Sequence, residues 1–427
     1  MSMELMVHTE TPQMQCSRSD HGIQKMWPLL LLLSVSMTIA SPHDHLKEDY
    51  CNGQGEGDNL PEASMQFAIT LYKVVSAMPV RPPLNVLISP ISTYTTLAML
   101  ALGARSSTRQ QILRAMCLSD SQANKILKED YKNFLAELTT EEGNAEFGIS
   151  NWFFLEKSIK PSSKYKQDMA RYYNVSLQGI DFTDPENAQQ EINEEVNGQT
   201  DGKMEDLIND LDDQTKMVLL DYARFNAKWN SPFTSQGLRR APFIVNQMNT
   251  INVEMMHRVG QYRTFKDDTT IMVEVPYTDQ IVLLIIVPKN VSLYEVERKL
   301  SAQLIDSYMS EARTSLLDLY IPKISLEEQI NVHYGLLRMG VTDVFSDSAD
   351  LTGISKHPRL KASILYHKTQ VKIAENATES SGAEVTRGVT LPKALELRID
   401  RPFFALVYNK QVKTVLLLGR IMDPTQV

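Results

Sequence analysis

The residue patterns that usually mark an active site are missing from this chain of 427 residues. It has no phosphate-binding GxxxxGK[ST] loop, no dinucleotide-binding GxGxxG, no HExxH helix and no CxxC pair. The GxSxG turn that exposes a nucleophilic serine is also absent. His43 and His45 are spaced for weak metal binding, but a solvated polar tail explains them better. The sequence therefore predicts a protein that is not an enzyme and that holds no metal or cofactor.

Charge and composition exclude further classes. The chain carries 43 Lys and Arg against 52 Asp and Glu, a net charge of -9, which argues against a broad basic face for nucleic acid. Hydrophobic residues make up 43% and charged residues 22%, as in ordinary globular proteins, and three cysteines are too few for a disulfide framework. One stretch alternates lysines with acids and so does not form a basic stripe: Lys125, Lys128 and Lys132 with Asp120, Glu129, Asp130 and Glu137.

The N-terminal segment predicts secretion. Residues 27–40 read WPLLLLLSVSMTIA after Lys25, which is typical of a signal peptide (about residues 26–40) cleaved after Ala40, and Met26 is a possible true start. A buried helix is the alternative interpretation of this run. No later apolar run exceeds ten residues, so we expect no membrane anchor. Residues 1–40 are thus assigned to the signal region and residues 41–59 to a flexible polar tail.

If the protein is secreted, its cysteines could form a disulfide and its three sequons could carry glycans. Cleavage leaves Cys51 and Cys117, which either pair or both remain free. The Asn-x-Ser/Thr acceptor pattern for N-linked glycans occurs at Asn174, Asn290 and Asn376.

Hydrophobic periodicity predicts one large α+β domain over residues 60–427. Helices are expected from Leu60 and over Ser92–Gly103, with amphipathic acidic segments at residues 120–141 and 184–209. In the second half, continuous apolar runs predict strands that are covered on both faces, at residues 280–289, 316–324 and twice within 403–421. No linker, repeat or change of composition divides the chain.

Several stretches, in order and at consistent spacing, resemble the serpin family over about residues 60–427. They read NVLISPISTYTTLAMLALGARSSTRQQI at 85–112, INEEVNGQTDGKMEDL at 192–207, DYARFNAKWNSPF at 221–233, and DRPFFALVYNK followed by VLLLGRIMDPT at the C-terminus. The chain looks most like the alpha-1-antitrypsin group, which also contains corticosteroid- and thyroxine-binding globulins. The resemblance implies three β-sheets, eight to nine helices and an exposed reactive loop. It also implies inhibition of a protease, which cleaves the loop and is trapped when the cut loop inserts into the main sheet.

The resemblance also implies which residues control the opening of that sheet. Lys323 and Glu375 match the family's ion pair where insertion begins, and Trp229 matches the tryptophan at the same opening. A small polar cluster is expected lower down, and an aspartate replaces the family's asparagine in it: Ser89, Ser92, Asp221 and His367. Because a carboxylate beside His367 favours the imidazolium form, we hypothesise that opening depends on pH. The alternative is that His367 is an ordinary hydrogen-bonded core residue.

The reactive loop is expected at about residues 375–397, with the cleaved bond at Leu391–Pro392. Proline after the bond disfavours cleavage, because the leaving nitrogen is a tertiary amide in a fixed ring. Bonds after Arg387 and Lys393 are the alternatives for a trypsin-like protease. The small residues of the hinge depart from the family pattern: Glu375, Ala377, Thr378, Glu379, Ser380, Ser381, Gly382, Ala383 and Glu384. Strand alternation turns Glu384 inward on insertion, where an unpaired carboxylate is costly.

Two functions therefore follow from the resemblance. The first is a secreted, monomeric inhibitor of a serine protease of chymotrypsin-like fold. The second is a non-inhibitory carrier of a small hydrophobic hormone, which the irregular hinge and Pro392 favour. Lys410 and Lys413 stand where the hormone carriers have ligand-pocket residues, and neither pocket is reproduced.

Overall fold

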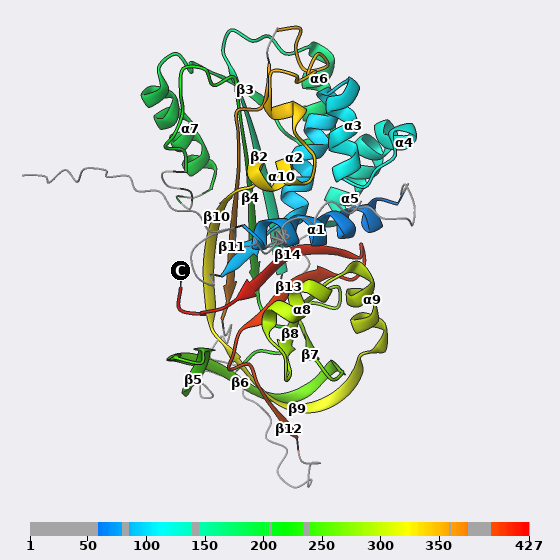
Figure 1. Ribbon diagram of the computed structural model, residues 1–427, viewed down its shortest axis with the longest axis vertical. Coiled ribbons are helices and arrows are strands. Elements are labelled where there is room, and N and C mark those ends of the chain that lie inside the picture. Colours follow the sequence, from blue (N-terminus) through cyan, green and yellow to red (C-terminus); the bar gives the residue numbers. More distant parts are fainter. Residues whose placement is uncertain are drawn as a thin grey trace, which may run out of the picture. The chain divides into compact units, whose positions relative to one another are not determined.

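The computed structural model describes residues 59–78, 85–138, 145–200, 202, 204, 207–233, 239–357, 360–374 and 394–426. All of these belong to one compact unit that spans residues 48–427. Within it, helices and mixed sheets share a continuous core, which confirms the predicted α+β class (Figure 1).

The described helices gather mainly in the first half of the unit. Two of them are continued by π-helical turns, η2 and η3. Their bounds are α1 Leu60–Ser76, α2 Pro90–Gly103, α3 Ser106–Ala115, α4 Asp120–Lys125, η2 Ile126–Asp130, α5 Tyr131–Leu138, α6 Ser163–Asp168, η3 Met169–Tyr173, α7 Pro185–Gln199, α8 Leu293–Lys299, α9 Ala302–Glu311 and α10 His333–Arg338, with a 3-10 turn at Asp343–Phe345.

Helix α2 is buried over its whole length, as its apolar sequence predicts. Helix α7 is amphipathic: Asp184 caps it by accepting the Asn187 N–H, and Ala188, Ile192 and Val196 form its buried stripe. It ends at Gln199, ten residues before the predicted end of the acidic segment. Gly202, at φ 75°, follows the helix and its N–H returns to the Asn197 carbonyl.

A five-stranded sheet runs through the described part of the unit in the order β10–β11–β4–β2–β3. Its strands are β10 Ile324–Asn331, β11 Ile364–Ile373, β4 Met217–Ala227, β2 Ala145–Glu156 and β3 Leu177–Ile180. Alternate residues of β4 face two cores, so Leu219 and Ala223 join the large core with α2, while Val218 and Leu220 pack with α7. The helices therefore cover both faces of this sheet, with α7 on one side and α2 on the other (Figure 1).

The second described sheet has nine strands, in the order β1–β14–β13–β8–β7–β6–β9–β12, with β5 also paired to β6. Their bounds are β1 Val86–Ile88, β14 Thr414–Ile421, β13 Phe403–Asn409, β8 Ile281–Pro288, β7 Thr270–Pro276, β6 Asn249–Lys266, β9 Arg313–Pro322, β12 Leu395–Arg398 and β5 Arg239–Asn246. Strand β6 is 18 residues long, and its two ends pair with different strands, β5 and β7. Through β6, strands that the resemblance assigns to two separate sheets form one hydrogen-bonded sheet.

The burial of these strands tests the prediction that the apolar strands are covered on both faces. Every residue of β8 and β13 is buried, and β14 is buried except at Arg420, as continuous apolar runs predict. Strand β9 differs, because it is exposed at its start and buried only at alternate positions from Leu317 to Leu319. Among the described helices, none is both long and apolar enough to cross a membrane.

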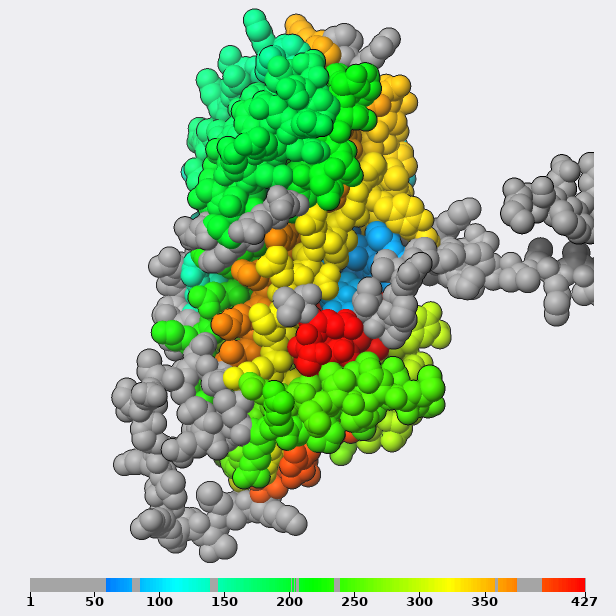
Figure 2. Space-filling view, turned by 90° about the vertical axis from the view of Figure 1, so that its left-hand side faces the viewer, coloured from blue at the N-terminus to red at the C-terminus, as the bar shows by residue number. Residues whose placement is uncertain are grey.

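The edge strand β10 carries a glutamate, Glu328, whose carboxyl group is partly buried. Figure 2 shows β10 (yellow) reaching the surface beneath α7 (green). Glu328 is only partly exposed there, and burial raises the pKa of its carboxyl from an ordinary value of 4.5 to about 7. Its neighbour Glu327 lies on the exposed side and forms an ion pair with Lys368 at 2.7 Å.

We predict that Glu328→Gln stabilises the protein above pH 7. Between pH 4.5 and 7 the folded state binds more protons at this site than the unfolded state does, so the wild-type free energy of unfolding falls as pH rises. The gain at pH 8 should be about 1 kcal/mol, because partial exposure screens the full effect. It should vanish at pH 4, as measured by urea unfolding.

Glu327→Gln is the matched contrast. It removes the partner of Lys368, whose side chain is 7% exposed, and should lower stability at pH 8. If Glu328→Gln is no more stable than wild type at pH 8, the unfavourable burial of Glu328 is refuted.

Candidate functional site

The centre of the five-stranded sheet is a parallel pairing of β11 with β4. It extends in unbroken register from Ile364 opposite Val218 to Val371 opposite Phe225. No other described strand lies between the two. A strand that enters this sheet at its middle must therefore separate them.

A buried polar cluster lies under this pairing. His367 of β11 stands directly opposite Asp221 of β4, and His367 Nδ1 contacts Asp221 Oδ1. Ser92 of α2 donates to the same carboxylate at 2.5 Å. Ser89, at the N-cap of α2, donates its backbone N–H to His367 Nε2 at 2.9 Å and its hydroxyl to Leu416 O of β14 at 2.8 Å. The four residues that the resemblance grouped are thus in contact, and they tie β4, β11, α2 and β14 together.

These bonds decide the protonation state of the imidazole. Because the Ser89 N–H donates to Nε2, that nitrogen must be the acceptor, and the proton lies on Nδ1 facing the Asp221 carboxylate. This bonding pattern is that of a neutral histidine and fits the alternative of an ordinary hydrogen-bonded core residue, while the hypothesis that opening depends on pH stays a prediction. Both side chains are 0% exposed, and hydroxyls from Ser92 and Thr93 help to satisfy the buried carboxylate.

Trp229 lies where β11 leads into the reactive-loop region. It is 2% exposed, its ring stacks on Tyr277 at 4.4 Å between centroids, and its indole N–H donates to Ala374 O at 2.8 Å. Ala374 directly follows β11, so this bond fixes the end of the strand that leads toward the loop expected at about residues 375–397.

Lys323 lies at the end of β9 and contacts a carboxylate that the sequence did not suggest. Its Nζ is 3.0 Å from Glu254 Oε2 of β6, and its backbone N–H donates to Glu254 O at 2.8 Å. The expected partner, Glu375, lies outside the described residues, so the proposed Lys323–Glu375 pair stays a prediction.

The chain returns from the loop into β12, which pairs with β9 from Leu395 to Arg398. The expected loop boundary at residue 397 thus falls inside this strand. Arg398 lies over the ring of Tyr320 at 3.9 Å, and Tyr320 stacks on His257 at 4.4 Å. We call these three residues, one each from β12, β9 and β6, the cross-strand stack. His257 also contacts Asp318. The stack holds β12 on the sheet by cation–π and ring contacts.

The remaining predicted residues divide between described and undescribed parts. The hinge from Ala377 to Glu384 and the bond Leu391–Pro392 lie outside the described residues, as does Asn376. Asn174 at the end of η3 and Asn290 after β8 are exposed and have φ values of 55° and 60°; their glycosylation stays a prediction. Cys117 is disulfide-bonded, and the other cysteines, Cys16 and Cys51, are outside the described residues.

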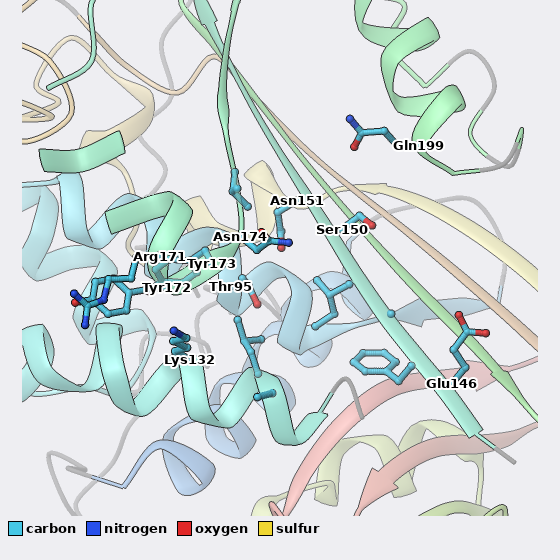
Figure 3. Close-up of a pocket in the computed structure, with 16 residues that line it drawn as sticks. Thr95, Lys132, Glu146, Ser150, Asn151, Arg171, Tyr172, Tyr173, Asn174 and Gln199 are labelled. Atoms are coloured by element: carbon cyan, nitrogen blue, oxygen red, sulfur yellow. The ribbon is translucent and has the colours of Figure 1, made fainter. Parts of the chain in front are cut away.

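A cavity of about 610 Å³ lies between β2, α5 and η3, with Asn174 at its wall (Figure 3). The described residues that line it include no histidine or cysteine. Two of its polar groups already have partners, since Asn151 donates to Thr96 at 3.0 Å and Glu146 pairs with Arg224. The cavity therefore offers no nucleophile with an adjacent base. Across the described residues, His, Cys, Asp and Glu nowhere form a group of three that would hold a metal ion.

The comparisons with known proteins agree with the class that this fold defines. The family model for Serpin (serine protease inhibitor) matches residues 62–424, and the chain belongs to the serpin family. Serine protease inhibitor A6 of Xenopus laevis is 31% identical, over 90% of this chain and 91% of that protein. Thyroxine-binding globulin of Ovis aries is 32% identical, over 93% and 98%. The structure of human thyroxine-binding globulin with thyroxine superimposes with a TM-score of 0.78 at 28% identity, over 86% of this chain and 99% of that one.

We predict that His367→Ala and Asp221→Asn differ sharply in stability. The alanine leaves the Asp221 carboxylate buried without its imidazole partner and should lower the free energy of unfolding by about 3–5 kcal/mol. Asparagine can still accept a hydrogen bond from Nδ1–H through its side-chain oxygen. Asp221→Asn should therefore lower the free energy of unfolding by about 1 kcal/mol or less. The measurement is the first unfolding transition in urea at pH 7.5. Equal losses in the two variants would contradict the neutral-histidine arrangement.

We predict that Arg398→Ala loosens β12. Without the guanidinium on Tyr320, amide hydrogen exchange at residues 395–398 should accelerate by about fivefold, as expected for a loss of about 1 kcal/mol. Arg401→Ala is the control, since among the described residues Arg401 pairs with the adjacent Asp400 and lies over no aromatic ring. If both variants exchange at the wild-type rate, the cross-strand stack does not anchor β12.

Proposed function

We propose that this protein is a secreted inhibitor of a serine protease of chymotrypsin-like fold, which it traps after cleavage of its reactive loop. It does not turn over a substrate. The cut loop enters the five-stranded sheet between β4 and β11, and the protease goes with it. The observation that carries the proposal is the closed β4–β11 pair, with the loop leaving from its end at Ala374.

The structure around the loop supports this role. Trp229 fixes the departure of the loop from one sheet, and the cross-strand stack fixes its return on the other. Cleavage between these anchors would release the N-terminal part of the loop while leaving the C-terminal part on β9. The His367–Asp221 cluster keeps the sheet closed until then.

Two features of the loop sequence set its efficiency. Glu384 turns inward on insertion, so it must be buried or protonated when the strand forms. Pro392 slows attack on the preceding bond, with Leu391 as the bait for a chymotrypsin-like or elastase-like pocket. We infer that insertion is slow compared with that of an inhibitor with a hinge of small residues only.

The same proposal includes the setting of the protein. The chain is made with a signal peptide at about residues 26–40, acts outside the cell as a monomer, and carries glycans at Asn174, Asn290 and Asn376. A glycan on Asn376 would stand at the root of the hinge and hinder opening there. Lys323 and Glu375 form the ion pair at the top of the sheet.

A second candidate is a carrier of a small hydrophobic hormone. The similarity to thyroxine-binding globulin over almost the whole of both chains favours it, together with the hinge and Pro392. One contact argues against a thyroxine-type ligand: Lys410 Nζ is 3.2 Å from the buried Glu274 carboxylate, which Arg263 also contacts at 3.2 Å. The charge of Lys410 is therefore already compensated within the protein.

We predict an SDS-stable complex when the purified protein is mixed with chymotrypsin, elastase or trypsin. Glu384→Ala should raise the fraction of complex over cleaved inhibitor by about tenfold, since a change of 1.4 kcal/mol in the competing barriers has this effect. Thr378→Arg places a charge on the inserting face, so this variant should be cleaved without complex. The readout is gel densitometry after loop cleavage.

Glu379→Ala is the matched control, because Glu379 is assigned to the outward face and its loss should leave the ratio unchanged. Cleavage by all three proteases without complex, in wild type and in Glu384→Ala, would refute the inhibitor. Saturable binding of thyroxine or cortisol to the same sample would then support the carrier.

A further inference from the structure

A second cavity, of about 420 Å³, lies beside α6 and gathers positive charge in an acidic protein. Four cationic side chains line it, from the loop after α2, from α3, from η2 and from α6, against one carboxylate. They are Arg105, Arg109, Lys128 and Lys164, with Asp168. α6 and β12 lie at opposite ends of the unit, so this cavity is remote from the reactive-loop region (Figure 1).

We propose that this cavity binds a small multivalent oxyanion, whose phosphate or sulfate groups bridge Arg105 and Lys164. Neither the family match nor the relatives' names assign such a site. The proposal does not depend on whether the protein inhibits a protease.

Arg105 is held in place by backbone groups. Its Nη1 donates to Leu102 O at 3.1 Å and Ala104 O at 2.7 Å, and among the described residues no acceptor is found for Nε or Nη2. The guanidinium lies against Gly353, where an added Cβ would be 2.5 Å from Nη2 and 2.6 Å from Cζ. A side chain at 353 would thus displace it. Arg105 is exposed, and its guanidinium, which is oriented by these two carbonyls, keeps N–H donors for a planar or tetrahedral oxyanion.

Acids pair with two of the four cations, Lys128 and Arg109, and among the described residues Arg105 and Lys164 form no ion pair. Asp350 is close enough for Arg105 to help lower the pKa of its carboxyl, but the larger cause is the Thr352 hydroxyl, and Ser106 also bonds it. Asp350 is not among the residues that line the cavity. Asp168, which does line it, pairs with Lys128 at 2.9 Å.

The side chains of Arg109 and Lys164 differ in how tightly they are held. Arg109 is buried in the wall, where it bonds Asp120 at 3.0 Å and Asn124 at 3.2 Å, so it supplies a fixed charge. Asp120 is 64% exposed and solvent screens it. Lys164 is exposed, and no described residue pairs with it, so its ammonium can swing to a bound anion.

Further lysines around α6 make the electrostatic potential near the cavity more positive. Residues 157–166 contain four lysines and no acid. Three of them, Lys157, Lys160 and Lys166, line a neighbouring cavity between β3 and α6, and of these Lys157 pairs with Asp181. Such a cluster raises the local concentration of anions and favours ligands with several negative charges over a single carboxylate.

The test is isothermal titration of the full secreted chain with sodium tripolyphosphate and, separately, with sucrose octasulfate, at constant ionic strength. We expect one saturable site. Lys164→Ala and Arg105→Ala should each weaken binding about tenfold, as for loss of one charge-assisted contact. Gly353→Ala should weaken it as well without changing any charge. Tighter binding of tripolyphosphate identifies phosphates as the source of the ligand, and tighter binding of the octasulfate identifies sulfated sugars.

Lys266→Ala is the matched control, because it removes an exposed lysine from β6, away from α6. It should bind like wild type. Lys164 is exposed and its replacement should not disturb folding, so the test does not depend on Arg105→Ala remaining folded. No saturable binding of either probe, or unchanged affinity in Lys164→Ala and Gly353→Ala, overturns the proposal.

Discussion

The pairing of β4 with β11 is the constraint on which the rest of the structure depends. It must be stable enough to hold a closed sheet, yet it must separate if a strand is to enter. A buried polar cluster lies at this pairing in place of a fully apolar contact. Asp221, His367, Ser89 and Ser92 satisfy one another across it. In the proposed mechanism, insertion of a strand separates Asp221 from His367, so these bonds would contribute to the barrier to opening.

The two ends of the reactive-loop region are attached to different sheets. β11 belongs to the five-stranded sheet and β12 to the nine-stranded one. Trp229 holds the first end through a hydrogen bond, and the cross-strand stack holds the second through ring contacts. A chain that spans two sheets can be cut without losing either anchor. In the proposed mechanism, this arrangement would let the N-terminal half of a cut loop move while β12 stays in place.

Continuous apolar sequence was sufficient to predict α2, β8, β13 and β14, because burial on all sides needs no knowledge of partners. Resemblance placed Asp221 beside His367, and the structure brings them into contact. It did not reveal the neutral form of His367, because that depends on a backbone N–H from Ser89. The contacts of Lys323 with Glu254 and of Arg398 with Tyr320 were also missed. The two residues of each pair lie 69 and 78 positions apart in the sequence (323 − 254 and 398 − 320) and meet only through strand register.

We propose that cleavage of the loop lets it enter the sheet between β4 and β11. The most direct measurement is the thermal unfolding temperature of the purified protein before and after one cut in residues 385–393 by a protease that is then removed. Insertion completes a six-stranded sheet, so we expect a higher unfolding temperature for the cleaved form. An unfolding temperature that stays the same or falls after the cut would contradict it.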